Sequence, residues 1–253
     1  MRAALIVSAL ALGFGLASSV AAKDATTMKQ VDWPFKGVFG TFDRAAQQRG
    51  FQVYTQVCSA CHSMKLLYYR DLAGIGLGDE AIKEIAAGVE VTDGPNDEGE
   101  MFQRPGRPSD HFRSPFPNEN AARAANNGAY PPDLSLITKA RDGGADYVYS
   151  ILTSFSEEVP ADVKMMPGMN YNTAFSGNQI AMAPPLAEGA VTYADGTPAT
   201  VDQMASDVAS FLAWASEPEM EVRKRLGVKV ILFLLVLTGM LYAVKRKVWS
   251  RLH

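Results

Sequence analysis

Five consecutive residues, Cys58-Ser59-Ala60-Cys61-His62, constrain this chain more than any other stretch. The pattern Cys-x-x-Cys-His is typical of the attachment site of a c-type haem. Two thiols one turn apart can each form a thioether with a porphyrin vinyl group, and the next residue then lies under the iron as an axial ligand. The pattern therefore predicts one covalently attached haem c, held by Cys58 and Cys61, with His62 on the iron. The alternative is a reduced or disulfide-linked cysteine pair followed by a chance histidine.

The first 22 residues, Met1 to Ala22, have the features of a secretory signal peptide. Arg2 supplies the positive start, and the apolar stretch from Ala3 to Ala17 is too short to span a bilayer comfortably. Small residues end the segment, so we expect cleavage after Ala22, which would leave Lys23 as the mature N-terminus. An uncleaved anchor is the alternative. Export suits the first motif, because covalent haem attachment takes place outside the bacterial cytoplasm.

A second apolar segment, LGVKVILFLLVLTGMLYAV, runs from Leu226 to Val244. It is close to the roughly 20 residues that a membrane-spanning helix needs. Lys229 near its start can reach the lipid headgroups, and Tyr242 and Trp249 fall where aromatic residues line a membrane interface. Apolar residues occur all round the helix, which argues against a soluble core helix.

These two segments divide the chain into four parts. We expect a cleaved signal peptide (1–22), a periplasmic haem domain (23–222), a transmembrane anchor with basic flanks (223–247) and a short cytoplasmic tail (248–253). Basic residues lie on both sides of the anchor, so the signal peptide decides the orientation. The chain is therefore predicted to cross the bacterial inner membrane once, with the haem domain in the periplasm.

The charge of the chain is distributed unevenly. All 27 acidic residues lie between Lys23 and Val222, where only 15 of the 24 basic residues are found, so the predicted domain carries a net charge of −12. This acidity argues against nucleic acid and favours a cationic protein partner. The alternative is that the acidity serves solubility alone. Many of the acidic side chains are close in sequence: Asp79, Glu80, Glu84, Glu90, Asp93, Asp97, Glu98 and Glu100.

Two segments have strong helical patterns. Asp43 to Gln56 leads into the haem motif, and Thr200 to Ser216 begins with Thr200 and Gln203 in a capping-box pattern. We expect the two helices to pack across each other. Shorter helices are expected over Ala121–Asn127 and Asp146–Phe155.

The rest of the domain is irregular in pattern. Asp93 to Asn120 is rich in Pro, Gly and acidic residues and predicts a long surface excursion, and Pro160 to Asn178 predicts a loop. Strand signals are weak and limited to short runs such as Ala190 to Tyr193. A mostly α domain with long loops is therefore expected.

A second iron ligand would close the haem to exogenous ligands and favour electron transfer, and a methionine opposite the histidine raises the reduction potential. Met182 is favoured because two prolines stiffen the chain just after it and small alanines flank it. His111 competes as a second histidine ligand, although its charged, Pro-rich surroundings predict that it is exposed. The other methionines that position does not exclude are Met28, Met101, Met165, Met166, Met169 and Met220.

Several motifs beyond the first resemble one family. The chain resembles the cytochrome c1 family, the membrane-anchored haem subunit of the quinol–cytochrome c oxidoreductase (cytochrome bc1) complex, over essentially the whole mature chain. The stretches that carry the resemblance are RGFQVY before CSACH, ARAANNGAYPPDLS from Ala122, AR-x-GG-x-DYV from Ala140, AMAPPL from Ala181, WASEPE from Trp214 and the basic Arg223-Lys224-Arg225 before the anchor.

The resemblance implies a mostly α, class I cytochrome c-like haem domain with long loop insertions and one C-terminal transmembrane helix. It also implies that the chain is the electron-transfer subunit of an enzyme, with no separate active site of its own. The expected partners are cytochrome b and the Rieske iron–sulfur protein in a membrane complex. One electron would pass from the Rieske protein to a soluble cationic cytochrome c.

The same resemblance implies roles for individual residues. Met182 would be the sixth iron ligand, and Arg141 would pair with a haem propionate, which suits the fork geometry of a guanidinium group. Asn126, Pro132 and Tyr147 would line the haem pocket. Some members carry an extra disulfide in the loop before the methionine, but this chain has no further cysteines, so packing or the Pro and Gly pattern must stiffen that loop.

Two other functions fit parts of the sequence. One is a different membrane-anchored monohaem c-type cytochrome, such as an oxidase subunit. The other is an exported thiol–disulfide oxidoreductase that uses Cys58 and Cys61. The second is disfavoured because its motif normally follows a β-strand, whereas a helix is expected before Cys58.

Overall fold

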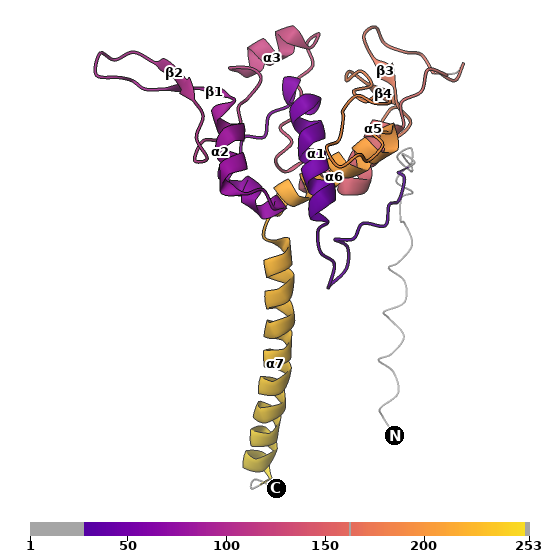
Figure 1. Ribbon diagram of the computed structural model, residues 1–253. Coiled ribbons are helices and arrows are strands. Elements are labelled where there is room, and N and C mark those ends of the chain that lie inside the picture. The colour runs from indigo at the N-terminus through magenta and orange to yellow at the C-terminus, as the bar shows by residue number, and fades with distance from the viewer. Residues whose placement is uncertain (1–27, 162, 251–253) are drawn as a thin grey trace, which may run out of the picture.

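Two helices that cross at the centre of the domain organise the fold: α1 (Arg44–Gln56) and α6 (Val201–Ser216). They are seen in the computed structural model, which describes residues 28–161 and 163–250 (Figure 1). The helices meet at Gly50, where an added Cβ would lie 2.1 Å from the Asp207 carbonyl oxygen and 2.7 Å from Phe211 Cβ. The predicted pair of crossing helices is therefore confirmed, and glycine is what allows their backbones to approach so closely.

An ion pair beside this crossing holds the two helices together. The guanidinium group of Arg49 donates from Nε and Nη2 to both carboxylate oxygens of Asp207, at 2.9 and 3.0 Å. Asp207 is almost fully buried, and Arg49 also reaches Asp195 at 3.0 Å. The two-pronged geometry satisfies a carboxylate that would otherwise be costly to bury.

The start of each helix follows its sequence signals, with one correction. Asp43 caps α1 by accepting hydrogen bonds from the next residues, and Thr200 caps α6 by accepting from the Gln203 backbone N–H at 3.1 Å. The predicted capping box is not completed, because the Gln203 side chain donates instead to Asp207 at 3.1 Å. The buried ion pair competes successfully for that amide.

Shorter helices surround the crossing pair. Their bounds are η1 (Cys58–Ala60), η2 (Tyr69–Ile75), α2 (Asp79–Ala87), α3 (Glu119–Ala125), α4 (Ile137–Ala140) and α5 (Ala145–Thr153). Helices α4 and α5 pack on α6, and α2 packs on η2. The indole of Trp214 on α6 lies against Gly74 of η2, where an added Cβ would come within 2.8 Å of the ring.

Two small antiparallel ladders interrupt the loops. Strands β1 (Glu90–Asp93) and β2 (Phe102–Pro105) form a hairpin in which Glu90 faces Pro105. Strands β3 (Asn170–Tyr171) and β4 (Gln179–Ile180) close the second long loop. Neither ladder was predicted from the sequence, and the weak strand signal over residues 190–193 corresponds to no strand in the described chain.

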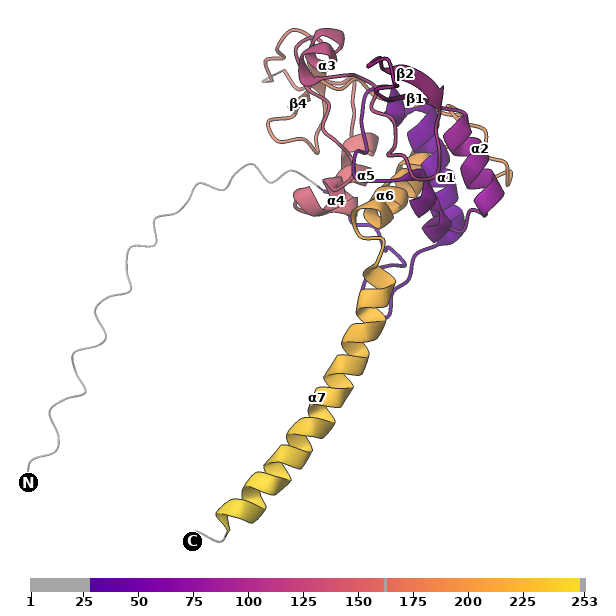
Figure 2. The same cartoon turned by 90° about the vertical axis from the view of Figure 1, so that its left-hand side faces the viewer.

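The last helix, α7 (Met220–Trp249), leaves the domain and extends away from it (Figures 1 and 2). It is long and apolar enough to cross a membrane, and none of its most apolar stretch is buried against the rest of the described chain. The predicted architecture, mostly α with long loops and one C-terminal apolar helix, is confirmed. The signal peptide at 1–22 lies outside the described residues, and the other domain boundaries stay predictions.

Candidate functional site

The Cys-x-x-Cys-His motif lies at the carboxyl end of α1, where the chain turns into the short helix η1. The backbone N–H groups of Cys61 and His62 both donate to the Cys58 carbonyl, at 3.2 and 2.9 Å. This tight turn places the two thiols and the imidazole on one short segment. Cys58 packs against the hydrophobic core, whereas Cys61 is exposed.

The imidazole of His62 is held by a residue far away in the chain. Its Nδ1 lies 2.8 Å from the carbonyl oxygen of Pro132. A carbonyl can only accept, so Nδ1 carries the proton and Nε2 keeps a free lone pair. Burial lowers the pKa of His62, although its hydrogen bond to Pro132 and the charge of Asp133 oppose this. The ring is therefore held as the neutral tautomer that binds a metal through Nε2.

A network around Asp133 keeps Pro132 in place beside the histidine. The Asp133 carboxylate accepts from the Ser63 hydroxyl and the Lys65 backbone N–H, both at 2.8 Å, and from the Ser135 N–H at 2.9 Å. Burial raises the pKa of Asp133, but these hydrogen bonds outweigh it and the pKa lies below its usual range. The carboxylate therefore joins the segment after the motif to the segment that supplies the Pro132 carbonyl.

Cys58 lacks the lowered pKa that a redox-active thiol needs. Burial raises the pKa of Cys58 to about 12, and the charge of Cys61 adds to the effect. Redox-active cysteines need a lowered pKa, since the thiolate is the attacking species. No strand precedes Cys58 in the described chain, because α1 does. Both observations disfavour the thiol–disulfide oxidoreductase.

Met182 lies two residues after β4, on a segment separate from the histidine. Asn170 on β3 donates from Nδ2 to the Met182 carbonyl oxygen at 3.3 Å, and the Met182 side chain is half-buried. The small β3–β4 ladder thus supports the chain just before the methionine. The role of Met182 as an iron ligand stays a prediction.

The structure narrows the other candidates for the second ligand. Met101 and Met166 are largely exposed, and Met220 is buried in the core at the start of α7. The sulfur of Met28 lies against Gly143. His111 is exposed, as expected, and its ring lies against that of Tyr68 at a tilt of 32°, with the ring centroids 3.8 Å apart. Met165 and Met169 are half-buried, as Met182 is.

The remaining predicted residues occupy three different elements. Arg141 ends α4 and is exposed; its guanidinium donates only to the Ala140 carbonyl, and no carboxylate of the described chain pairs with it. Asn126 ends α3 and donates to the Ala122 carbonyl at 2.7 Å. Tyr147 on α5 is half-buried against the core. Their contacts with a haem stay predictions, but an unpaired guanidinium is available for an anionic group.

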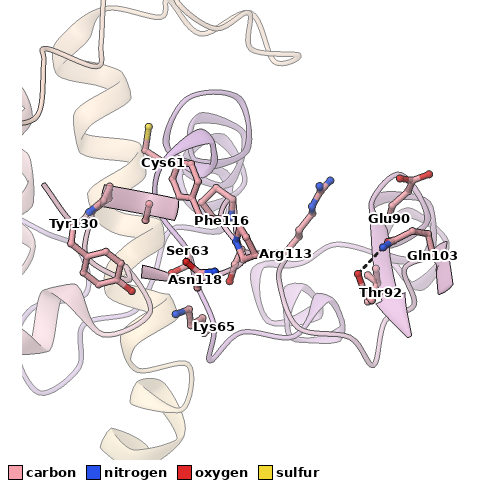
Figure 3. Close-up of a pocket in the computed structure, with 16 residues that line it drawn as sticks. Cys61, Ser63, Lys65, Glu90, Thr92, Gln103, Arg113, Phe116, Asn118 and Tyr130 are labelled. Carbon is pink, nitrogen blue, oxygen red and sulfur yellow. Dashed lines mark hydrogen bonds between the residues drawn. The ribbon is translucent and has the colours of Figure 1, made fainter. Parts of the chain in front are cut away.

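An open cavity of about 650 Å³ lies beside the exposed cysteine (Figure 3). Of the predicted haem residues only Cys61 lines it, so it is not the space between His62 and Met182. Its wall includes Lys65, Tyr130 and Arg113, together with part of the β1–β2 hairpin. The cavity therefore gives solvent access to the Cys61 side of the motif.

The chain is similar in sequence to known proteins over most of its length. Residues 33–252 match the family model described as the Cytochrome C1 family. The chain belongs to the cytochrome C1 family. It is 46% identical to cytochrome c1 of Rhodospirillum rubrum, over 98% of this chain and 97% of that protein. It is 52% identical to a Solanum tuberosum protein named cytochrome c1-2, heme protein, mitochondrial, over 94% of this chain and 92% of that protein.

Two further relatives place the family in a larger setting. A Candida albicans protein named cytochrome b-c1 complex catalytic subunit, mitochondrial, is 50% identical over 87% of this chain and 76% of its own length. A Bradyrhizobium diazoefficiens protein named cytochrome b/c1 is 49% identical over 87% of this chain, which corresponds to only 35% of that relative. The resemblance inferred from the sequence motifs is thus confirmed at the level of the family.

Sequence reasoning missed the residues that position the histidine. Tyr54 on α1 donates from its hydroxyl to the His62 carbonyl at 3.2 Å, and Asp133 joins the segment after the motif to the segment of Pro132. The Asx turn at Asp133 could have been expected, since Asp side chains commonly accept from the backbone N–H two residues on. Its partner segment, about 70 residues away in the chain, could not be inferred from that turn.

Proposed function

We propose that this chain is a membrane-anchored c-type cytochrome subunit of a quinol–cytochrome c oxidoreductase. In this proposal it passes one electron from the Rieske iron–sulfur protein to a soluble cationic cytochrome c. The observation that carries the proposal is the motif at the end of α1, with the His62 Nδ1 held 2.8 Å from the Pro132 carbonyl. That donor set, two thiols and a neutral imidazole with a free Nε2, fits covalent haem c.

Each part of the chain has a defined task in this proposal. Cys58 and Cys61 would form the thioether bonds, and His62 and Met182 would bind the iron. The Pro132 carbonyl fixes the tautomer and the plane of the imidazole, and Arg141 binds a propionate carboxylate. Asn126 and Tyr147 line the pocket with Pro132. The bound haem supplies the one-electron couple, and two protein ligands leave no iron site for a substrate.

The assembly and orientation of the protein follow from the same reasoning. Helix α7 would span the inner membrane once, with the haem domain in the periplasm and the basic tail in the cytoplasm. Cytochrome b and the Rieske protein would be its partners in the membrane. The names of the relatives support a cytochrome b-c1 complex as the setting. A membrane-anchored oxidase subunit is the alternative, and copurification with cytochrome b would distinguish the two.

The test uses the full-length chain purified from membranes. A pyridine haemochrome spectrum should report one covalently attached haem per chain. Met182→Leu should keep that haem, lower the reduction potential and allow carbon monoxide to bind, because the sixth position opens. Met169→Leu, at another half-buried methionine of the same region, is the matched control and should bind no carbon monoxide. An unchanged potential in Met182→Leu would assign the ligand to another residue.

A further inference from the structure

The loop that precedes α1 exposes two apolar side chains. Val38 and Phe39 are 63% and 84% exposed, and Phe39 is the most exposed large apolar side chain in the described part of the chain. Single exposed apolar residues are common, but an aromatic side chain next to a second apolar residue at a loop tip is less easily explained. The question is what this tip contacts.

The base of the loop is firmly packed, so the tip is held outward. The Phe35 ring stacks on Trp33 with centroids 5.4 Å apart and lies 5.1 Å from the Phe42 ring. The Thr41 backbone N–H donates to the Pro34 carbonyl at 3.1 Å, which closes the loop. Gly40 permits the turn, since a Cβ there would lie 2.0 Å from the Lys36 carbonyl oxygen.

The same loop is attached to the first turns of α7. Lys224 donates from Nζ to the carbonyls of Phe35 and Gly40, at 2.6 and 3.1 Å. The Phe42 backbone N–H donates to the Glu221 carboxylate at 2.8 Å, and Arg44 pairs with the other oxygen of that carboxylate. Both views show the chain before α1 descending beside the start of α7 (Figures 1 and 2).

The attachment point lies where α7 changes from polar to apolar. The basic residues Arg223, Lys224 and Arg225 come directly before Leu226, and a helix rises about 1.5 Å per residue. Lys224 is therefore only about 3 Å along the axis from the first residue of the apolar segment. Lys224 donates to the loop and Arg223 pairs with Glu217, whereas Arg225 pairs with no carboxylate of the described chain, so its charge is available to anionic lipid headgroups. Apolar side chains held at the same level would enter the outer part of the bilayer.

We propose that the loop tip, Val38 and Phe39, is a second membrane contact that inserts into the bilayer interface beside α7. The inference rests on the proposed function only in requiring that α7 spans a membrane. The contacts of the loop with Glu221 and Lys224 fix the domain relative to α7, but a single helix would leave both free to tilt together relative to the bilayer. An apolar tip attached to α7 and inserted beside it would fix the tilt. The chemistry that the tip recognises is that of an acyl-chain and headgroup boundary.

The test is depth-dependent quenching of a fluorescent label. Phe39→Cys, Leu235→Cys and Asp97→Cys are each labelled with the same nitrobenzoxadiazole thiol reagent in the full-length chain. The proteins are reconstituted in phosphatidylcholine–phosphatidylglycerol vesicles that carry bromines at shallow or deep acyl positions. Leu235 lies in the middle of the apolar segment, and Asp97 lies in the exposed turn of the β1–β2 hairpin, on the far side of the domain. The unsubstituted chain, treated with the same reagent, shows how much label attaches to Cys58 and Cys61.

We expect the label at position 39 to lose most of its emission with shallow bromines and less with deep ones. The label at 235 should respond most to deep bromines, and the label at 97 to neither. Quenching at 235 without quenching at 39 would overturn the inference and leave the anchor intact. A label at 39 that bromolipids do not quench and aqueous iodide cannot reach would also overturn it, since a protein would then cover the tip. No quenching at 235 would overturn the anchor and the inference together.

Discussion

Gly50→Ala should test the central contact of the fold, the crossing of α1 and α6. The new Cβ would lie 2.1 Å from the Asp207 carbonyl oxygen, about 1.3 Å short of the 3.4 Å at which ordinary van der Waals contact begins. It would also lie 2.7 Å from Phe211 Cβ. Both obstructing atoms belong to α6 near its backbone, so neither can move aside as the end of a flexible side chain can. The two helices must separate instead.

The size of the effect follows from this geometry. Inserting atoms into a packed core commonly costs about 1–3 kcal/mol, and a contact between two helix backbones belongs at the upper end. Alanine is the better helix former, which offsets roughly 0.5–1 kcal/mol. The free energy of unfolding should therefore fall by about 2–2.5 kcal/mol. For a domain of this size each kcal/mol lowers the melting temperature by about 2–4 °C, so a fall of roughly 4–10 °C is expected.

The assay is thermal unfolding of the purified full-length chain, followed by far-ultraviolet circular dichroism. Gly227→Ala is the matched control, because Gly227 is also helical and nothing lies within 4 Å of its added Cβ. The control should melt with the parent or slightly above it, since alanine is the better helix former. A Gly50→Ala variant that melts with the parent as well would show that the crossing relaxes without cost, and the argument from close approach would be wrong.

Three other changes test the site and its surroundings. Arg141→Ala should lower thermal stability and alter the reduction potential. Arg141→Lys should recover only part of both, since lysine lacks the fork geometry. If Arg141→Ala had the melting temperature and the reduction potential of the parent, the proposed contact with a propionate would be disproved. Burial raises the pKa of Asp146, but hydrogen bonds from Lys36, Val31 and Trp33 outweigh it, so the pKa is lowered. The stabilising contribution of Asp146 is therefore present above about pH 4 and is lost as the pH falls through the lowered pKa. Asp146→Asn should flatten the curve of stability against pH in that range, and an unchanged curve would contradict this. The rate at which a cationic cytochrome c oxidises the reduced protein should fall steeply from low to high salt, by roughly 10- to 1,000-fold, while the rate of reduction through the Rieske protein changes little. An oxidation rate that stopped-flow measurements find independent of salt would mean that the acidity serves solubility alone.

The helices that could be predicted are those whose signals are local. Asp43 and Thr200 mark the starts of α1 and α6, and the apolar periodicity of each segment gives the face that packs. Helix α7 follows from composition alone. The small elements could not be predicted, because α4 has only four residues and β3 and β4 have two each. Such elements form through tertiary contacts rather than intrinsic propensity.

The β1–β2 hairpin shows the same limit in a charged region. Pro, Gly and acidic residues predict a surface excursion, and the hairpin is indeed largely exposed. What orders it is Arg104, which pairs with Asp93 across the hairpin and with Asp110 at 2.7 Å. Hydrogen bonds from Arg104, against a smaller effect of burial, lower the pKa of Asp110 to about 2. A run of charges in sequence does not reveal which of its members pair in space.

In the candidate site, too, the local features could be predicted and the contacts between distant segments could not. The five-residue motif specifies its chemistry locally, whereas the Pro132 carbonyl that fixes the His62 tautomer comes from a distant segment. Met182 was favoured by its stiff local sequence and by family resemblance, whereas Arg141, Asn126 and Tyr147 rest on family resemblance alone. The structure distributes these residues over four further segments. Composition and periodicity contain no information on how such segments converge.

Helix α1 connects the start of the anchor helix α7 to the haem motif. Its amino end is held by Glu221 of α7, through Phe42 and Arg44, and its carboxyl end leads directly into the haem motif. Thirteen helical residues span about 20 Å, so the motif is separated from the start of the anchor by a fixed distance. The crossing at Gly50 prevents α1 from pivoting between these ends. A site carried on a rigid element keeps its geometry, and electron transfer between proteins requires a cofactor at a constant position. The close approach of α1 to α6, the attachment to α7 and the proposed insertion of the loop tip would therefore together fix the height and the tilt of the motif relative to the membrane.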